Sequence, residues 1–340
     1  MSNLIRVKML QRDVGSRDCG NPERKYTLEH QGCLFIMDGD CRDYDWLVVY
    51  EEVPRGGGSV VDEAEQLACP KEHTILVTSE PPTIKVYPSC YTRQFAHVLT
   101  THTPEQLAHP NHHFSEGSLF WWAKYPLEEV FSMPDYEKTH DLSTVCSAKQ
   151  QTHTLHQRRY NLVKYISEHI PELDWYGRGV KPLEKKCDAL SPYRYHIAME
   201  NYIAPYHWTE KISDPLLGLC LTFYAGDPRL GDILPPESFI PIPADDPEEA
   251  CRIIRTAIDN HEYERRLPAI REARRLLLEK YCYFSRVASV IHEAMATEQT
   301  PPQVTPCLIK GRHRLRRNPI NAISGFLETL RCRKRLSAGN

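Results

Sequence analysis

The sequence lacks a long hydrophobic run. Its longest nearly apolar stretch, residues 216–226, is about half of the roughly 20 residues that a membrane-spanning helix needs. Residues 1–14 carry charges at positions where a signal peptide would be apolar. We therefore expect a chain that neither crosses a bilayer nor enters the secretory route unaided, and that works in the cytoplasm.

The sequence also lacks the common metal and nucleotide motifs. Its 12 cysteines contain no CxxC pair, so we expect reduced, mostly buried thiols and no zinc knuckle. Neither GxxxxGK[ST] nor GxGxxG is present. Asp38-Gly39-Asp40 falls in a turn-like stretch, and His109, His112 and His113 lack the spacing of metal ligands, which favours solvated loop histidines. We expect no metal site.

The length of the chain indicates two domains. At 340 residues it exceeds what one hydrophobic core usually holds, and 41% hydrophobic with 26% charged residues is typical of a folded globular protein. Short apolar runs alternate with helix-sized segments in both halves. This pattern predicts two α/β domains, residues 1–150 and 151–300, with a ligand in the cleft between them, followed by a tail, residues 301–340.

Hydrophobic periodicity places the elements coarsely. In the first half we expect a crossover helix within residues 54–70 and strands over residues 34–37, 46–53 and 74–78. In the second half we expect strands over 173–176, 195–199 and 219–224, and helices over 159–166, 248–255 and 262–281. The run Phe120-Trp121-Trp122 is interpreted as core or as an acceptor wall, because no basic stripe accompanies it. We expect no nucleic-acid binding.

Charge is distributed unevenly. Residues 310–340 hold nine Lys or Arg and one acidic residue, Glu328, so this segment carries +8 while residues 1–309 carry −11. Ile320, Ile323, Phe326, Leu327 and Leu330 share one helical face within the basic segment. Residues 310–335 therefore suit a helix on an anionic membrane surface. The alternative is a helix that packs back on the acidic remainder of the chain.

Polar side chains follow one predicted strand directly. Glu200 and Asn201 come after the strand 195–199, at the carboxyl end where open α/β sheets bind ligands. Thr209 is suited to cap a following helix, whose first amides favour an anion, and Lys211 adds a positive charge. We interpret this segment as a cradle for a nucleotide diphosphate.

The start of that helix stays open. Pro215 inside the helix would cost about 3 kcal/mol. The helix therefore begins either after Thr209 or one turn later, after Asp214 as the cap.

Three motifs at fixed spacing and one further run stand between residues 193 and 240: Tyr193-Arg194-Tyr195, Met199-Glu200-Asn201, Thr209-Glu210-Lys211, and Leu234-Pro235-Pro236-Glu237-Ser238-Phe239-Ile240. Together they resemble the donor-binding domain of glycosyltransferase family 10, the α-1,3/1,4-fucosyltransferases. Two positions depart from the family pattern. Met199 replaces a phenylalanine, and His207 replaces a tyrosine, although an imidazole still donates a hydrogen bond.

The resemblance implies a GT-B architecture, in which two Rossmann-like domains face each other across a cleft. It implies that the second domain binds GDP-fucose and that no essential metal is needed. By the same carry-over Lys211 and an arginine, Arg158 or alternatively Arg159, neutralise the diphosphate. Glu210 contacts ribose hydroxyls, and Glu200, Asn201 and His207 line the donor site.

Inverting transfer needs a carboxylate that takes the proton of the attacking acceptor hydroxyl. We expect Glu80 in this role, because it follows an apolar strand and stands in a context that resembles the family's glutamate. Glu51 and Glu52, also at a strand end, are the alternatives.

The sequence thus predicts an inverting transferase that moves L-fucose from GDP-fucose to a hydroxyl of a glycan acceptor. A transferase for another nucleotide sugar, and a binder of glycans or nucleotides without activity, remain the alternatives.

Overall fold

The computed structural model describes residues 4–11, 26–53, 64–117, 130–132, 134–150, 155–300 and 302–338. The chain divides into two compact units: residues 1–115 with 284–340 form the first, and residues 116–283 form the second. The second unit therefore begins ahead of the boundary that we expected at residue 150. Residues 284–300 belong to the first unit, to which the chain returns.

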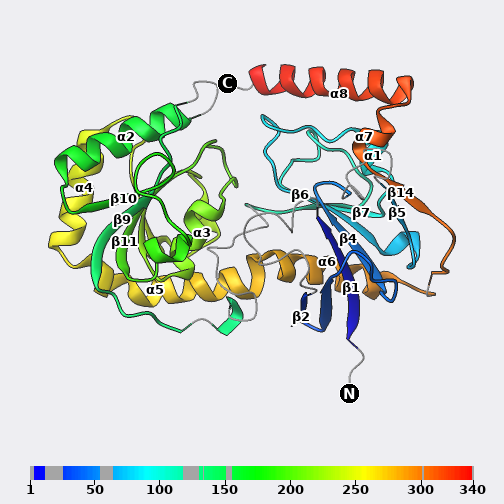
Figure 1. Ribbon diagram of the computed structural model, residues 1–340, viewed down its shortest axis with the longest axis horizontal. Helices are drawn as coiled ribbons and strands as arrows, with labels where there is room; N and C mark the ends of the chain where they lie inside the picture. Colours follow the sequence, from blue (N-terminus) through cyan, green and yellow to red (C-terminus); the bar gives the residue numbers. More distant parts are fainter. Residues whose placement is uncertain are drawn as a thin grey trace. The chain divides into compact units, whose positions relative to one another are not determined.

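The first unit is built on a seven-stranded sheet in the order β2-β3-β1-β4-β6-β7-β8 (Figure 1). Neighbouring strands pair in parallel except β2 and β3, which form a hairpin across Gln31 and Gly32, both at positive φ. Val48 and Leu76 on the central strands are fully buried, as the apolar runs predict. The strands are β1 (Ile5–Gln11), β2 (Tyr26–His30), β3 (Cys33–Met37), β4 (Trp46–Tyr50), β6 (Thr74–Thr78), β7 (His97–Thr100) and β8 (His112–Phe114).

Two local predictions for this unit need correction. Part of the expected crossover helix, residues 54–63, lies outside the described residues, as does Phe120-Trp121-Trp122. Ala64–Gln66, however, forms strand β5 and pairs with β14 (Leu308–Lys310), so the helix prediction is wrong there. A partner more than 240 residues further along the chain decides this conformation, and no local pattern reports it. His112 and His113 lie in β8 and are partly buried, so they are not solvated loop residues.

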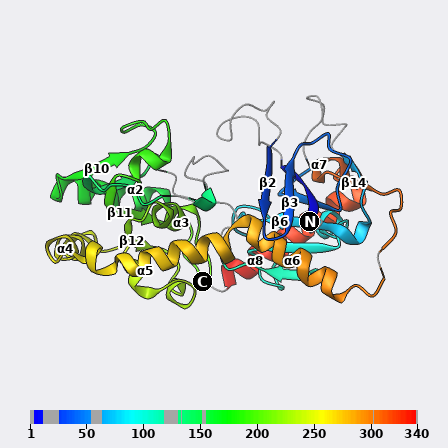
Figure 2. The ribbon, with the colours of Figure 1, turned by 90° about the horizontal axis from the view of Figure 1, so that it is seen from below.

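Helices complete the first unit. The structure has α1 (Ser89–Thr92), α6 (Tyr283–Thr297), α7 (Arg312–Leu315), α8 (Pro319–Ala338) and the short 3₁₀ turn η2 (Lys71–His73). Helix α6 lies along the sheet (Figure 2), where the Phe284 ring meets Phe35 at 5.0 Å between centroids and the His292 imidazole contacts the Gln31 carbonyl. None of the described helices is long and apolar enough to cross a membrane.

The second unit holds a five-stranded sheet in which every neighbouring pair is parallel, in the order β10-β9-β11-β12-β13. Its strands are β9 (His140–Val145), β10 (Leu173–Tyr176), β11 (Tyr193–Met199), β12 (Leu221–Ala225) and β13 (Phe239–Pro241). Its helices are α2 (His156–His169), α3 (Glu210–Leu217), α4 (Pro247–Asp259) and α5 (Glu262–Leu276), which continues as a π-helical turn, Leu277–Tyr281. Short 3₁₀ turns are η3 (Val130–Ser132), η4 (Lys186–Ala189), η5 (Leu230–Asp232) and η6 (Pro236–Ser238).

Helices α2 and α4 pack together, as do α3 and α5 (Figures 1 and 2). The strands and helices that we expected in this half are all present within a few residues. The prediction of an α/β fold with two Rossmann-like units is thereby confirmed.

The strand order of the second unit locates its binding site. From β9 the chain goes outward to β10, then returns to the other side of β9 to place β11, β12 and β13. The order therefore reverses between β9 and β11. Open parallel sheets bind ligands at such a switch point, outside the carboxyl ends of the strands.

Candidate active site

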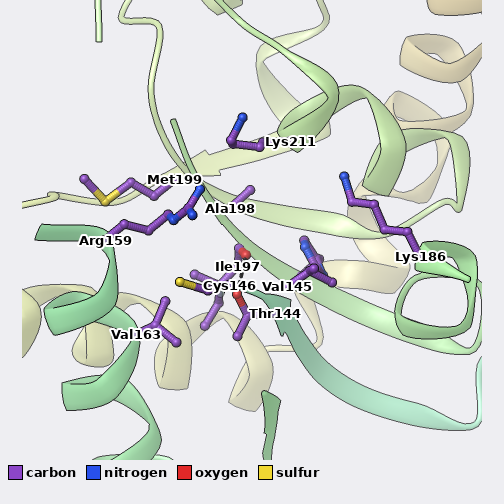
Figure 3. A pocket seen from close by; sticks show the side chains of 11 residues that line it. Thr144, Val145, Cys146, Arg159, Val163, Lys186, Ile197, Ala198, Met199 and Lys211 are labelled. Atoms are coloured by element: carbon purple, nitrogen blue, oxygen red, sulfur yellow. Dashed lines mark hydrogen bonds between the residues drawn. The ribbon is translucent and has the colours of Figure 1, made fainter. Parts of the chain in front are cut away.

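A small pocket lies at this switch point. It is lined by the ends of β9 and β11, by helices α2 and α3, and by η4; the lining residues are Thr144, Val145, Cys146, Arg159, Val163, Lys186, His196, Ile197, Ala198, Met199 and Lys211 (Figure 3). Residues at the ends of two neighbouring strands, β9 and β11, thus form much of its lining. Three cationic side chains from three different elements stand around it.

Arg159 comes from the first turn of α2 and is 9% exposed. Its Nη1 donates to Asn201 Oδ1 at 2.8 Å, which fixes the guanidinium next to the end of β11. Its Nε is buried and has no hydrogen-bond partner among the described residues. A buried charged donor without an acceptor is costly, and an anionic ligand would supply that acceptor.

Arg158, which we favoured for the diphosphate, is placed elsewhere. Its guanidinium forms a surface ion pair with Asp245 at 3.0 Å and contacts the Ala244 carbonyl. It does not line the pocket. Of the two arginines that the sequence left open, the structure brings Arg159 to the site.

Lys211 lies in the first turn of α3 and is largely buried. Its Nζ lies 2.9 Å from Glu210 Oε1, 3.0 Å from Thr209 Oγ1 and 3.5 Å from Glu200 Oε2. Burial opposes its charge, but the two carboxylates outweigh burial and raise the pKa of Lys211. The ammonium is therefore charged at neutral pH.

Helix α3 begins directly after Thr209, the first of the two alternatives that the sequence left open. Thr209 is the N-cap, and its hydroxyl accepts from the Lys211 amide. Pro215 sits inside the helix, so the alternative start after Asp214 is wrong. The first amides of this eight-residue helix lie beside Lys211, where they favour an anion.

Glu200, which we expected to line the donor site, is instead enclosed by other groups of the protein. Its carboxylate is fully buried, and it accepts from the Thr209 amide and hydroxyl and from the Tyr224 hydroxyl. Burial raises its pKa. Gly226 is needed beside it, because an added Cβ would lie 2.2 Å from the Tyr224 hydroxyl and 2.8 Å from Glu200 Cγ. Glu200 holds the start of α3 in place.

Glu210 and His207 complete the residues expected at this site. The Glu210 side chain is 43% exposed; partial burial opposes its ionisation, but Lys211 and Lys186 outweigh this and lower its pKa to about 2. The His207 ring packs edge-on against Tyr202, and burial together with Lys211 lowers its pKa to about 4. At neutral pH, Glu210 is therefore a carboxylate and His207 a neutral imidazole.

Sequence reasoning missed two residues that line the pocket. Lys186 Nζ lies 2.6 Å from Asp214 Oδ2 and donates to the Glu210 carbonyl at 3.1 Å, so it ties η4 to α3. His196 is buried within β11 and contacts Ser143 Oγ at 2.8 Å. Both precede Glu200 by fewer than fifteen residues. Strand β11 is buried on both faces, so no alternation along it singles out His196.

The first unit holds the expected base. Glu80 is exposed, two residues beyond β6, and its carbonyl contacts His102 Nε2 at 2.8 Å. The alternatives are engaged: Glu52 is buried against Lys85 and Arg312, and Glu51 accepts from the Ser79 amide and from Lys85. Glu80 is the most accessible of the three carboxylates.

Among the described residues, no group of three or more His, Cys, Asp or Glu side chains is arranged to hold a metal ion. His97 Nδ1 and His113 Nε2 lie 3.1 Å apart and form a hydrogen bond with each other.

A comparison with known protein families indicates the class of protein to which the chain belongs. Residues 135–265 match the model described as glycosyltransferase family 10 (fucosyltransferase), C-terminal part. This segment contains the whole pocket, and it includes the motifs between residues 193 and 240. The protein is a glycosyltransferase. The match covers residues 135–265 of the second unit and supports a glycosyltransferase of the fucosyltransferase type.

Similar folds occur among solved structures. An α1,3-fucosyltransferase with GDP-fucose is 12% identical, with 88% of this chain and 93% of that chain covered and a TM-score of 0.48. The same type of enzyme with GDP is 13% identical, with 89% and 94% covered and a TM-score of 0.46. A DNA-modifying β-glucosyltransferase is 7% identical, with 86% and 100% covered and a TM-score of 0.44. Curated protein sequences give no significant match.

Proposed function

We propose that the protein transfers L-fucose from GDP-fucose to a hydroxyl of a glycan acceptor, with inversion at the sugar carbon. The observation that carries this proposal is the convergence of Arg159, Lys186 and Lys211 on one pocket at the switch point of the family 10 domain. A GDP-sugar presents two negative phosphates to such a site. Charge-assisted hydrogen bonds from guanidinium and ammonium groups are the strongest that proteins make to phosphate.

The same cations act on the reaction itself. As the bond between the sugar carbon and the diphosphate oxygen breaks, its electron pair stays on GDP and adds negative charge there. Arg159, Lys211 and the first amides of α3 are fixed before the reaction, so they stabilise this charge without rearranging. Asn201 orients the Arg159 guanidinium, and Glu200 orients Thr209 and Lys211.

Glu80 is proposed as the general base. The acceptor oxygen forms the new bond to the sugar carbon, and its proton passes to the Glu80 carboxylate. We assign acceptor binding to the first unit for this reason. The carboxylate has the exposure that contact with a substrate hydroxyl requires.

Independence from metal is part of the proposal. Three fixed cations supply positive charge to the departing diphosphate. Turnover in EDTA should equal turnover with magnesium within about twofold. A loss of activity in EDTA that magnesium restores would contradict this part.

Calorimetric titration with GDP, GDP-fucose and GDP-mannose tests the donor site without knowledge of the acceptor. We expect GDP to bind and Lys211→Ala to weaken it at least tenfold, about 1.4 kcal/mol. Lys164→Ala, which removes an exposed lysine of the same unit, is the matched control. Absent GDP binding, or equal affinity in both variants, would overturn the proposal.

The alternative donors and the inactive binder are separated by donor hydrolysis. Turnover of another nucleotide sugar, with none of GDP-fucose, would establish the sister activity. Binding of GDP without any turnover, even with a panel of glycan acceptors, would favour the inactive binder.

A further inference from the structure

Helix α8 is docked on the first unit through one face. The Glu328 carboxylate accepts from the Ser89 amide and from the Ser89 hydroxyl, both at 2.7 Å, at the start of α1. On the same face Gly325 lies against Pro88, where an added Cβ would approach to 3.2 Å, and Cys332 is buried. Arg335 donates to the Glu105 carbonyl at 2.8 Å. The helix therefore has a fixed orientation on this unit (Figure 1).

The opposite face of α8 is apolar and exposed. Its large side chains are between 44% and 76% exposed: Ile320, Ile323, Phe326, Leu327 and Leu330. Single exposed apolar residues are common, but five on one helical face form a continuous stripe. The sequence allowed two arrangements for this segment, a helix on a membrane surface or a helix packed on the chain. The polar face of α8 packs on the chain. The apolar face remains uncovered.

A basic pocket lies beside the start of this stripe. It is lined by Lys310 from β14, Arg314 and Leu315 from α7, and by Arg317, Asn318 and Asn321. Lys310 and Arg317 are exposed. Arg312, by contrast, turns inward and pairs with buried Glu52. The pocket thus gathers three cations, the groups that bind phosphate most strongly. Its two asparagine side chains are engaged with the backbone, since Asn318 Oδ1 accepts from the Ile320 amide and Asn321 Nδ2 donates to the Leu315 carbonyl.

We propose that α8 and this pocket dock the protein on an anionic bilayer, with the apolar stripe inserted among the acyl chains and a lipid phosphate in the basic pocket. Arg333 and Lys334, one turn beyond Leu330, are exposed and add positive charge at the level of the headgroups. This inference goes beyond the proposed function and does not rest on it. It identifies an anionic membrane as the partner of the segment.

Charge favours a bilayer over a second copy of the chain. The segment 310–340 carries +8, and its single carboxylate, Glu328, is already bound to Ser89. Two copies that met through this face would set these positive charges against each other. An anionic bilayer matches both the charge and the apolar stripe.

Sedimentation of the full-length protein with vesicles tests the proposal. Wild type is compared on neutral phosphatidylcholine vesicles and on vesicles with 30% phosphatidylglycerol, about the density of an anionic leaflet. We expect binding only to the anionic vesicles, and weaker binding at 1 M salt, where the Debye length falls to about 3 Å.

Two double variants separate the contributions. Lys310→Gln with Arg317→Gln should weaken vesicle binding about thirtyfold, from about 1 kcal/mol for each basic residue near the lipid. Ile323→Ser with Phe326→Ser should abolish stable binding while the circular dichroism and the affinity for GDP stay unchanged. Lys164→Gln with Arg252→Gln, which removes two exposed basic residues of the second unit, is the matched control and should bind as wild type does.

Equal binding to neutral and anionic vesicles would overturn the proposal. So would an affinity for anionic vesicles that is the same in both double variants as in the wild type. A concentration-dependent dimer that the Ile323→Ser, Phe326→Ser variant dissociates, without vesicle binding, would identify a second copy as the partner instead. If the wild type fails to bind GDP, only the proposed function is contradicted. The membrane proposal is unaffected, because vesicle binding is measured without nucleotide.

Discussion

Glu200 Oε1 accepts hydrogen bonds from both the amide and the hydroxyl of Thr209, each at 2.9 Å. This pair joins the end of β11 to the N-cap of α3 across nine residues of chain. Because the cap also receives the Lys211 amide, one buried carboxylate sets the position of the helix start and of its lysine. The contact connects the two sequence motifs, Met199-Glu200-Asn201 and Thr209-Glu210-Lys211.

Glu200→Gln should destabilise the second unit. The amide group of glutamine presents a donor where Thr209 or Tyr224 now donates, so a buried hydrogen bond is lost and Lys211 loses a carboxylate. We expect a loss of about 1–3 kcal/mol in the free energy of unfolding by urea. Glu237→Gln, an exposed glutamate of the same unit, should change it by less than about 0.5 kcal/mol. Equal stability of wild type and Glu200→Gln would contradict the structural role.

Arg159→Gln and Arg158→Gln provide a direct comparison of neighbouring arginines. Arg159 is buried at the pocket on Asn201, whereas Arg158 holds a surface ion pair. We expect Arg159→Gln to raise the dissociation constant of GDP at least tenfold and Arg158→Gln to change it less than about threefold. Calorimetric titration measures both. A larger effect at Arg158 would assign the diphosphate to Arg158, the residue that we favoured from the sequence.

Much of the second unit was predictable, because its signals are local. The strand 195–199, the cap at Thr209 and the lysine at 211 each depend on residues within a turn or two. The choice between Arg158 and Arg159 was not predictable from the sequence. Neighbouring helix positions differ by about 100° in direction, and only the packing of α2 decides which of the two arginines is buried. Strand β5 was missed for a similar reason, because its partner β14 follows far along the chain.

Glu80→Gln should lower kcat at least about a hundredfold and leave the affinity for GDP unchanged, the usual scale for loss of a general base. The measurement is acceptor-dependent turnover beside calorimetric titration of GDP. Glu72→Gln, an exposed glutamate ahead of the same strand, is the control. Unchanged turnover in Glu80→Gln would remove the proposed base.

Glu51→Gln separates a positioning residue from the base. The Glu51 backbone holds φ at +65°, a strained conformation for this residue, and its carboxylate accepts from the amides of Ser79 and Glu80 and from the Tyr87 hydroxyl. It therefore fixes the loop that carries Glu80. We expect a smaller loss of kcat than in Glu80→Gln, with the acid limb of the pH profile of kcat/KM kept. A profile that loses this limb in Glu51→Gln but keeps it in Glu80→Gln would exchange the two roles.

Buried His196 makes the second unit sensitive to acid. Burial, together with the charge of Lys186, lowers its pKa to about 3 in the folded protein, against about 6.5 in an unfolded chain. Between these values the unfolded state binds a proton that the folded state does not, so the free energy of unfolding falls as the pH falls below 6.5. From pH 7 to pH 5 this group alone removes about 2 kcal/mol. His196→Asn keeps a hydrogen-bonding group beside Ser143 but does not titrate, so urea unfolding of this variant should lose about 2 kcal/mol less over the same interval. An identical pH dependence in the two proteins would show that His196 takes up a proton without unfolding.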